Sequence, residues 1–181
     1  MKNNGPWKIK SSKEIYQNPW INVREDQVVR PDRKDGIFGV VEMKPGISVI
    51  ATNNYNNLYL NKEFHYISGK YSIEAVNGAI DNNETPLEAA KRELKEEHGI
   101  IAKDWINLGF VDPYTEIIKS RSYLFLARNI SFVKHEQEGT ETIKRIKVKF
   151  NEAVKMVLES KITHSPSCVL ILKTKEYLEN K

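Results

Sequence analysis

Three glutamates, Glu93, Glu96 and Glu97, crowd one short stretch of this chain, and their type and spacing suit metal chemistry. Glu93 and Glu97 are like charges at i and i+4, a pair that costs a helix roughly 0.2–0.5 kcal/mol. A hard divalent cation such as Mg²⁺ would turn this repulsion into ligation, because it takes oxygen ligands and keeps waters that can face a substrate phosphate. The alternative is a solvated acidic face.

The residues around the cluster predict a helix over about 86–98. Thr85 is an N-cap type, Pro86 suits the first helical position, and Glu88 completes a Thr-x-x-Glu capping box. Gly99 stands where a left-handed C-cap is expected. One face of this helix would be apolar and would carry Leu87, Ala90 and Leu94. The caps and the spacing agree, which favours a metal site over a solvated face.

The stretch resembles the complete Nudix box, with no departure at a fixed position. The matching pattern is Gly78, five residues, Glu84, seven residues, then Arg92-Glu93-Leu94-x-Glu96-Glu97-x-Gly99-Ile100. A pattern with so many fixed places is a strong signal. The resemblance implies a hydrolase that splits a nucleoside diphosphate linked to another moiety, X, with Mg²⁺ or Mn²⁺ bound by the box glutamates. It makes Glu93 and Glu97 the main metal ligands, supported by Glu96, and gives structural roles to Gly78, Gly99 and an Arg92–Glu84 ion pair.

The 181-residue chain is long enough to bury one substantial core, and its composition is that of an ordinary globular protein. No apolar run could span a bilayer, and the basic, polar start lacks the apolar centre of a signal peptide. The single cysteine, Cys168, excludes an internal disulfide and fits a reducing cytoplasm. It stands in an apolar run, which predicts buried packing rather than nucleophilic work.

A formal net charge of +4 is mild for a protein of this size. The basic residues are scattered among apolar ones, as at Lys144, Arg145, Lys147 and Lys149. A solvated strand face explains them as well as nucleic-acid binding would, and attraction of an anionic phosphate substrate is a third interpretation. We expect neither a membrane nor a nucleic acid as partner.

Residues 1–35 are interpreted as a small antiparallel β extension before a main domain over 36–181. Strand-like alternation runs through the extension and is broken by a turn at 30–36. The layout resembles the N-terminal region of the ADP-ribose and nucleoside-diphosphate-sugar branch of Nudix enzymes, where it often makes the dimer interface. We therefore expect a homodimer. The aromatic anchors, which a monomer's core would also use, are Trp7, Tyr16 and Trp20.

The main domain reads as an α/β fold. Its expected strands cover 37–43, 47–52, 58–64, 71–76, 105–111, 122–127 and 143–150. Two more helices are expected at about 151–160 and 165–179. A mixed sheet flanked by helices, an α/β/α sandwich, fits this order and is the fold that the resemblance implies.

A general base for the attacking water is expected in the acidic, loop-like segment 135–142, since a mobile loop can close over a metal site. In the ADP-ribose branch an acidic loop before the equivalent strand supplies this glutamate. Glu138 and Glu141 are the matching candidates, with Glu138 favoured over Glu141. Solvation of all the loop glutamates is the alternative.

Substrate recognition is expected to involve Glu74, which takes the place of the glutamate in the branch's Glu-Leu-Pro-Ala-Gly entry to the box. It could accept hydrogen bonds from a base or ribose, or help to hold metal. The carbonyl of Asn77 is a metal ligand candidate by position. His65 replaces the branch's usual arginine, a change from a permanently charged fork to a mostly neutral ring that weakens the case for ADP-ribose. Tyr114, in a segment that lacks the branch's usual glycine, could stack on a base or could simply be packed.

These features together predict a metal-dependent pyrophosphohydrolase that acts on ADP-ribose or another nucleoside diphosphate sugar and releases a nucleoside monophosphate and a sugar phosphate. One alternative is hydrolysis of a different nucleoside diphosphate-X, such as a dinucleotide or a nucleoside triphosphate. Another is a non-catalytic nucleotide-binding sensor. The intact glutamate cluster argues against the sensor, which would have little reason to keep a repulsive set of charges.

Overall fold

The computed structural model describes residues 1–53, 57–134 and 143–180. These residues form two compact units, one made of 1–44 and 112–121 and the other of 45–111 and the described part of 122–181. The expected boundary at residue 35 coincides with the start of the strand β4 (Asp35–Met43), which pairs along its whole length with β3 (Ile21–Val29). The first unit thus takes in β4 and a later segment of the chain.

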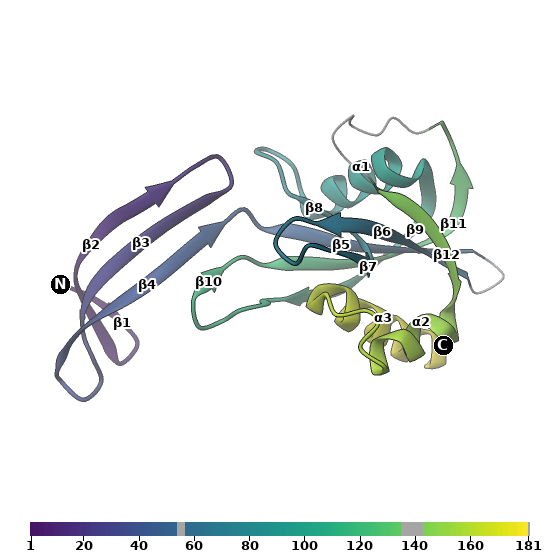
Figure 1. Cartoon of the computed structure of the whole chain (residues 1–181). Helices are drawn as coiled ribbons and strands as arrows, with labels where there is room; N and C mark the ends of the chain where they lie inside the picture. The colour runs from purple at the N-terminus through teal and green to yellow at the C-terminus, as the bar shows by residue number, and fades with distance from the viewer. Residues whose placement is uncertain (54–56, 135–142, 181) are drawn as a thin grey trace. The chain divides into compact units, whose positions relative to one another are not determined.

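The first unit is a sheet with the order β1-β2-β3-β4-β10 (Figure 1). The remaining strands are β1 (Lys2–Asn4), β2 (Trp7–Gln17) and β10 (Ile118–Lys119). All neighbours are antiparallel except β10, which pairs with β4 in parallel. The antiparallel extension expected from the sequence is therefore confirmed. Its sheet also contains β4 and the two-residue strand β10, which no hydrophobic pattern predicts.

The second unit is built on a mixed sheet with the order β12-β6-β5-β11-β9. In addition, β7 pairs with β6, and β8 pairs with β5. The pair β5–β11 is parallel and the others are antiparallel. The strands are β5 (Gly46–Thr52), β6 (Asn57–His65), β7 (Lys70–Glu74), β8 (Val76–Ala79), β9 (Ile100–Val111), β11 (Ser122–Phe132) and β12 (Lys144–Lys149).

Helices cover both faces of this sheet: α1 (Pro86–His98) lies on one side, and α2 (Phe150–Leu158) and α3 (Ser165–Glu179) lie on the other (Figure 1). The strand β5 is buried on both faces, as expected for a central strand between two helical layers. Its Val49 packs in the cluster with Leu94 of α1, and its Ile50 packs with Leu170 of α3. The predicted α/β/α sandwich is confirmed. None of the helices in the described ranges is long and apolar enough to cross a membrane.

The expected single strand over 71–76 is wrong, because the chain changes partner at Ala75. Here β7 ends against β6, and β8 begins against β5. Side chains satisfy the backbone at the break: the Ala75 N–H donates to Ser167 Oγ (2.9 Å), and Asn77 Nδ2 donates to the Ala75 carbonyl (2.8 Å). The break leaves Glu74 and Asn77 on either side of a bend, next to the start of α3.

Candidate active site

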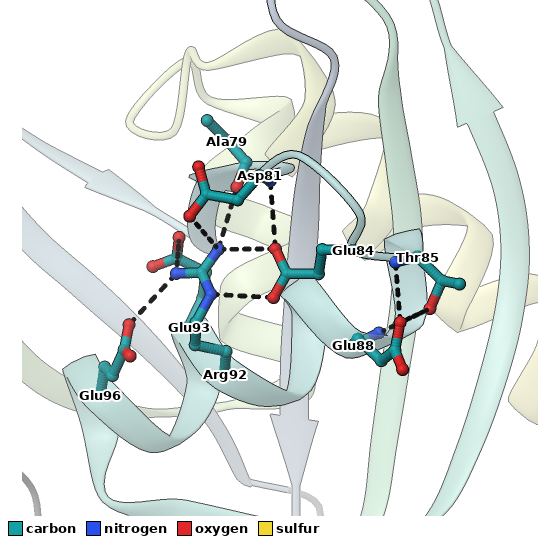
Figure 2. Close-up of polar contacts among 8 residues, drawn as sticks. All are labelled: Ala79, Asp81, Glu84, Thr85, Glu88, Arg92, Glu93 and Glu96. Atoms are coloured by element: carbon teal, nitrogen blue, oxygen red, sulfur yellow. Dashed lines mark hydrogen bonds and ion pairs between the residues drawn. The ribbon is translucent and has the colours of Figure 1, made fainter.

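The helix α1 begins and ends as its sequence predicts. Thr85 Oγ1 accepts a hydrogen bond from the Glu88 N–H, and the Glu88 carboxylate accepts one from the Thr85 N–H (2.8 Å), so both halves of the capping box form (Figure 2). At the other end Gly99 adopts φ = 60°, and its N–H donates to carbonyls of the last turn. Glycine suits this left-handed cap because it has no Cβ to clash. Both ends of the helix are thereby capped by the residues that the sequence predicts.

Arg92 ties this loop to the acidic face of α1, as Figure 2 shows. Its Nε and Nη2 donate to the two oxygens of Glu84 (2.9 and 3.0 Å), a bidentate pair, and Nη2 also donates to the Ala79 carbonyl (3.1 Å). Its Nη1 donates to Glu93 (2.7 Å) and to Glu96 (3.2 Å). The bond from Arg92 lowers the pKa of the Glu84 carboxyl, and Glu84 in turn raises the pKa of Arg92. The guanidinium thus offsets part of the repulsion among the glutamates.

Gly78 and Glu93 are in close contact across the gap between β8 and α1. A Cβ built on Gly78 would overlap the carboxylate of Glu93. Only glycine therefore allows the side chain of Glu93 to lie against the β8 backbone, and this contact explains why the strand entering the helix loop carries glycine here.

Glu97, unlike Glu96, is a buried carboxylate, with an exposed fraction of 5%. Its Oε2 accepts a hydrogen bond of 2.6 Å from Nδ2 of Asn61 on β6. Burial of a charged group costs free energy unless the group is paired or binds a cation. The burial therefore indicates that the Glu97 carboxylate has a role other than contact with solvent.

The three box glutamates fit a divalent cation by donor chemistry, since all are carboxylates on neighbouring turns of one helix. In the part of the chain that the structure describes, however, no three acidic, histidine or cysteine side chains already converge with metal-binding geometry. Glu93 and Glu96 are turned toward Arg92, and Glu97 is turned toward Asn61. Arg92 occupies one oxygen of Glu93 and one of Glu96, and a carboxylate has two oxygens with which to accept.

A second polar cluster surrounds Glu74, whose exposed fraction is 7%. His65 Nε2 lies 2.9 Å from Glu74 Oε1, and His164 Nδ1 lies 3.5 Å from Glu74 Oε2. His164 Nδ1 also lies 2.8 Å from Ser167 Oγ, the atom that receives the Ala75 N–H. Burial lowers the pKa of His164, an effect that Glu74 opposes and His65 reinforces. Glu74 thus lies between His65 and His164. The sequence predicted neither contact.

Comparison with known proteins decides the family. A model of the NUDIX domain matches residues 43–164, and a model of the nucleoside diphosphate sugar hydrolase N-terminal domain matches residues 7–41. This chain belongs to the Nudix family. Four of its box residues, Glu84, Arg92, Glu93 and Glu96, are drawn in Figure 2, and members of the family generally use divalent metal ions.

Two relatives of similar length match nearly the whole chain. ADP-ribose pyrophosphatase of Bacillus subtilis (strain 168) is 25% identical over 180 residues, which cover 93% of this chain and 94% of that protein. The methanol dehydrogenase activator of Bacillus methanolicus is 24% identical over 181 residues, 94% of each chain. A crystal structure of an ADP compounds hydrolase, 18% identical, superimposes with a TM-score of 0.85 over 99% of this chain and 98% of that one, which shows a shared fold. The protein is a Nudix hydrolase.

The other predicted site residues of this Nudix hydrolase lie in separate parts of the chain, and two of them are outside the described residues. Asn77 lies on β8, with its side chain bound to Ser48, Glu74 and the Ala75 carbonyl. Tyr114 is exposed and belongs to the unit that contains the extension. Glu138 and Glu141, the candidates for the general base, lie outside the described residues. The cysteine Cys168 is partly buried, its Sγ donates to the Ile162 carbonyl (3.2 Å), and burial raises the pKa of its thiol, in line with a packing role.

Sequence reasoning missed Asn61, His164 and Arg145. Asparagine is depleted in strands, so its presence in the middle of a buried one was a usable signal that a polar partner must exist. His164 directly precedes the predicted Ser165-Pro166 helix start but carried no motif. Arg145 was grouped with the lysines of a solvated strand face, whereas it lies over the Phe132 ring (4.9 Å) and donates to the His98 carbonyl.

Proposed function

We propose that this Nudix hydrolase is a metal-dependent pyrophosphohydrolase of ADP-ribose or another nucleoside diphosphate sugar, and that it releases a nucleoside monophosphate and a sugar phosphate. The observation that carries the proposal is the pairing of an intact box with an N-terminal region that matches the nucleoside diphosphate sugar hydrolase model. The B. subtilis relative, an ADP-ribose pyrophosphatase, supports the same substrate class.

Mg²⁺ or Mn²⁺ is the proposed cofactor. Glu93 and Glu97 would hold it, with support from Glu96 and the carbonyl of Asn77. A cation bound there would neutralise charge on the diphosphate during cleavage. The protein itself positions these carboxylates. Gly78 has no Cβ and so leaves room for the Glu93 carboxylate, and Nη1 of Arg92 donates to both Glu93 and Glu96.

Attack by water requires a base, and Glu138 or Glu141 is proposed to accept its proton, with Glu138 favoured. Binding of an anionic substrate is supported by a hollow of about 390 Å³ beside the box. Lys95 and Lys134 line it together with Arg92 and Glu96. Cations on these flexible stems can approach phosphate oxygens.

Glu74, His65 and Tyr114 are proposed to read the nucleotide or the sugar. Glu74 and His65 contact each other, so they would act as one unit. A base or a ribose would meet the Glu74 carboxylate with imidazole rings beside it, and His65 stands where the branch usually has an arginine guanidinium. This difference favours a second candidate, hydrolysis of another nucleoside diphosphate-X.

A homodimer formed through the extension is also proposed, in a cytoplasmic enzyme whose one cysteine suits a reducing compartment. Tyr16 and Trp20 have exposed fractions of 54% and 73%, so they are available to a second copy. Trp7 instead packs edge-on against Phe38 (5.5 Å) within the unit. Sedimentation of the wild type and of W20S tests the proposal: a dimer that dissociates in the variant supports it, and a monomeric wild type contradicts it.

The activity is tested by phosphate release with Mg²⁺ or Mn²⁺ across ADP-ribose, other nucleoside diphosphate sugars, dinucleotides and nucleoside triphosphates, each coupled to a phosphatase that acts on the product. We expect the highest kcat/KM on a nucleoside diphosphate sugar. A clear preference for a dinucleotide or a triphosphate would select the second candidate. Tight nucleotide binding with no turnover on any compound would instead identify a sensor.

A further inference from the structure

We propose that Asn61 and Arg145 are positioning residues that clamp the last turn of α1 and set the direction of the Glu97 carboxylate toward a bound cation. The proposal rests on the proposed function, in that Glu97 is taken as a metal ligand. It adds two residues outside the box, on β6 and β12, to the machinery of the site.

The first support is an amide whose orientation is determined by chemistry. Asn61 has an exposed fraction of 2% and stands between Glu97 and His98, at 2.6 Å from Glu97 Oε2 and 2.5 Å from His98 Nε2. An ionised carboxylate can only accept, so the amide must present its NH₂ group to Glu97. Its carbonyl oxygen then faces His98, whose Nε2 must carry the proton. One buried side chain thereby binds two consecutive residues of the helix in a single arrangement.

The second support comes from the strand beside it. Asn61 and Arg145 are direct partners in the antiparallel pairing of β6 and β12. Arg145 Nη1 donates to the carbonyl of His98, one of the last carbonyls of α1, which have no partner within the helix. A cation at this end also meets the negative pole of the helix dipole. The Phe132 ring under the guanidinium restricts its position further.

The two contacts act on the same turn from one pair of strands. Asn61 holds the side chains of Glu97 and His98, and Arg145 holds the backbone between them and the Gly99 cap. Residues 58 and 60 of β6 belong to the core under α2 and α3, so alternation directs Asn61 to the α1 face. Because Glu97 is buried, it cannot rely on water to order it; the clamp supplies that order before a metal arrives.

Mn²⁺ binding, followed by electron paramagnetic resonance of the free ion, tests the clamp on the full-length protein without substrate. The wild type and E97Q are titrated first, since a wild type that bound no Mn²⁺ through Glu97 would refute the proposed function itself. N61L keeps the volume and removes both bonds, and N61S keeps a hydroxyl that is too short to join both partners. Both should weaken Mn²⁺ binding by about tenfold to a hundredfold.

Asn57 offers a matched control, because it is a buried asparagine on the same strand that donates to Asn53 instead. N57L and N57S should lower the melting temperature about as much as the Asn61 variants, with Mn²⁺ affinity unchanged. R145Q should weaken Mn²⁺ binding and R145K, which keeps the cation, should restore part of it. Wild-type Mn²⁺ affinity in folded N61L and N61S would overturn the proposal, as would an equal loss in the Asn57 controls.

Discussion

Arg92 and Glu84 are joined by two parallel hydrogen bonds, 2.9 Å from Nε to Oε1 and 3.0 Å from Nη2 to Oε2. They connect α1 to the loop that leads into it, eight residues earlier. Both side chains are mostly shielded, with exposed fractions of 30% and 16%. The same guanidinium also donates to Glu93 and Glu96, so the pair both holds the loop and places a positive group beside two proposed metal ligands.

R92K should keep the charge but lose the fork, since an ammonium cannot make two parallel bonds to one carboxylate. A double-mutant cycle of R92K with E84Q should give a coupling energy of about 1 kcal/mol, which corresponds to about 2–4 °C in melting temperature for a protein of this size. Urea denaturation of the four proteins measures it. Strictly additive changes would show that the two residues do not act as a pair.

G78A should retain the fold and lose activity, because the added Cβ would force the Glu93 carboxylate from its place against β8. Displacement of a ligand by about 1 Å can cost about a hundredfold in rate. The control is G39A, since Gly39 lies in β4 with nothing within 4 Å of an added Cβ. Steady-state kcat at saturating Mg²⁺ decides the matter, and equal activity of the two alanine variants would contradict the contact argument.

E97Q should lower kcat by about a hundredfold or more, because even partners one shell away from a metal are worth about ten- to a hundredfold. Its stability without metal should be unchanged or higher, since the substitution removes a like charge at i+4 from Glu93 and leaves an oxygen to accept from Asn61. Melting curves with and without Mn²⁺ show both effects, as a metal that binds only the folded state raises the melting temperature. An undiminished Mn²⁺ shift together with normal turnover would remove Glu97 from the mechanism.

E138Q and E141Q separate the two candidates for the general base. Loss of a base costs about 10²–10⁴ in rate, while loss of a solvated carboxylate costs little. We expect the larger fall in kcat for E138Q, with KM for the substrate and Mn²⁺ affinity close to those of the wild type. If both variants kept wild-type kcat, the base would have to come from outside the segment 135–142.

The sequence predicts those parts of the fold that depend on neighbouring residues. The bounds of α1 follow from Thr85, Pro86 and Gly99, because a capping box and a left-handed cap are decided within a few positions. The alternation of apolar and polar residues likewise predicts the strands of the extension, and β-favouring residue types between turns predict most of the others. The two-residue strand β10 is too short to carry a period, and its place beside β4 is decided by pairing alone.

Long-range contacts of the site were beyond the sequence. The break at Ala75 depends on Ser167, which is 92 positions away, and the direction of Glu97 depends on Asn61, which is 36 positions away. No local preference encodes such partners, since a buried asparagine shows only that some partner is needed. The box indicates which carboxylates are proposed to bind metal, and the structure shows that Asn61 of β6 contacts Glu97 and that Gly78 of β8 contacts Glu93.

The last prediction concerns pH and His164, whose pKa burial lowers below its ordinary value of 6.5. Glu74, on the break between β7 and β8, opposes this shift, and His65 at the end of β6 reinforces it. As the pH falls through 6.5, the unfolded chain takes up this proton before the folded protein does. The contribution of His164 to the free energy of unfolding is therefore fully present above pH 6.5 and is lost toward the lowered pKa.

H164Q should flatten this part of the pH dependence, because glutamine keeps a polar group near Glu74 and Ser167 but does not titrate. Urea denaturation at intervals between pH 8 and pH 5 should show wild-type stability declining more steeply below about pH 6.5 than that of the variant. Titratable groups far from residue 164 behave alike in both proteins, so the difference between the two curves reports His164 together with its neighbours Glu74 and His65. Parallel curves would mean that His164 is as readily protonated in the folded protein as in the unfolded chain.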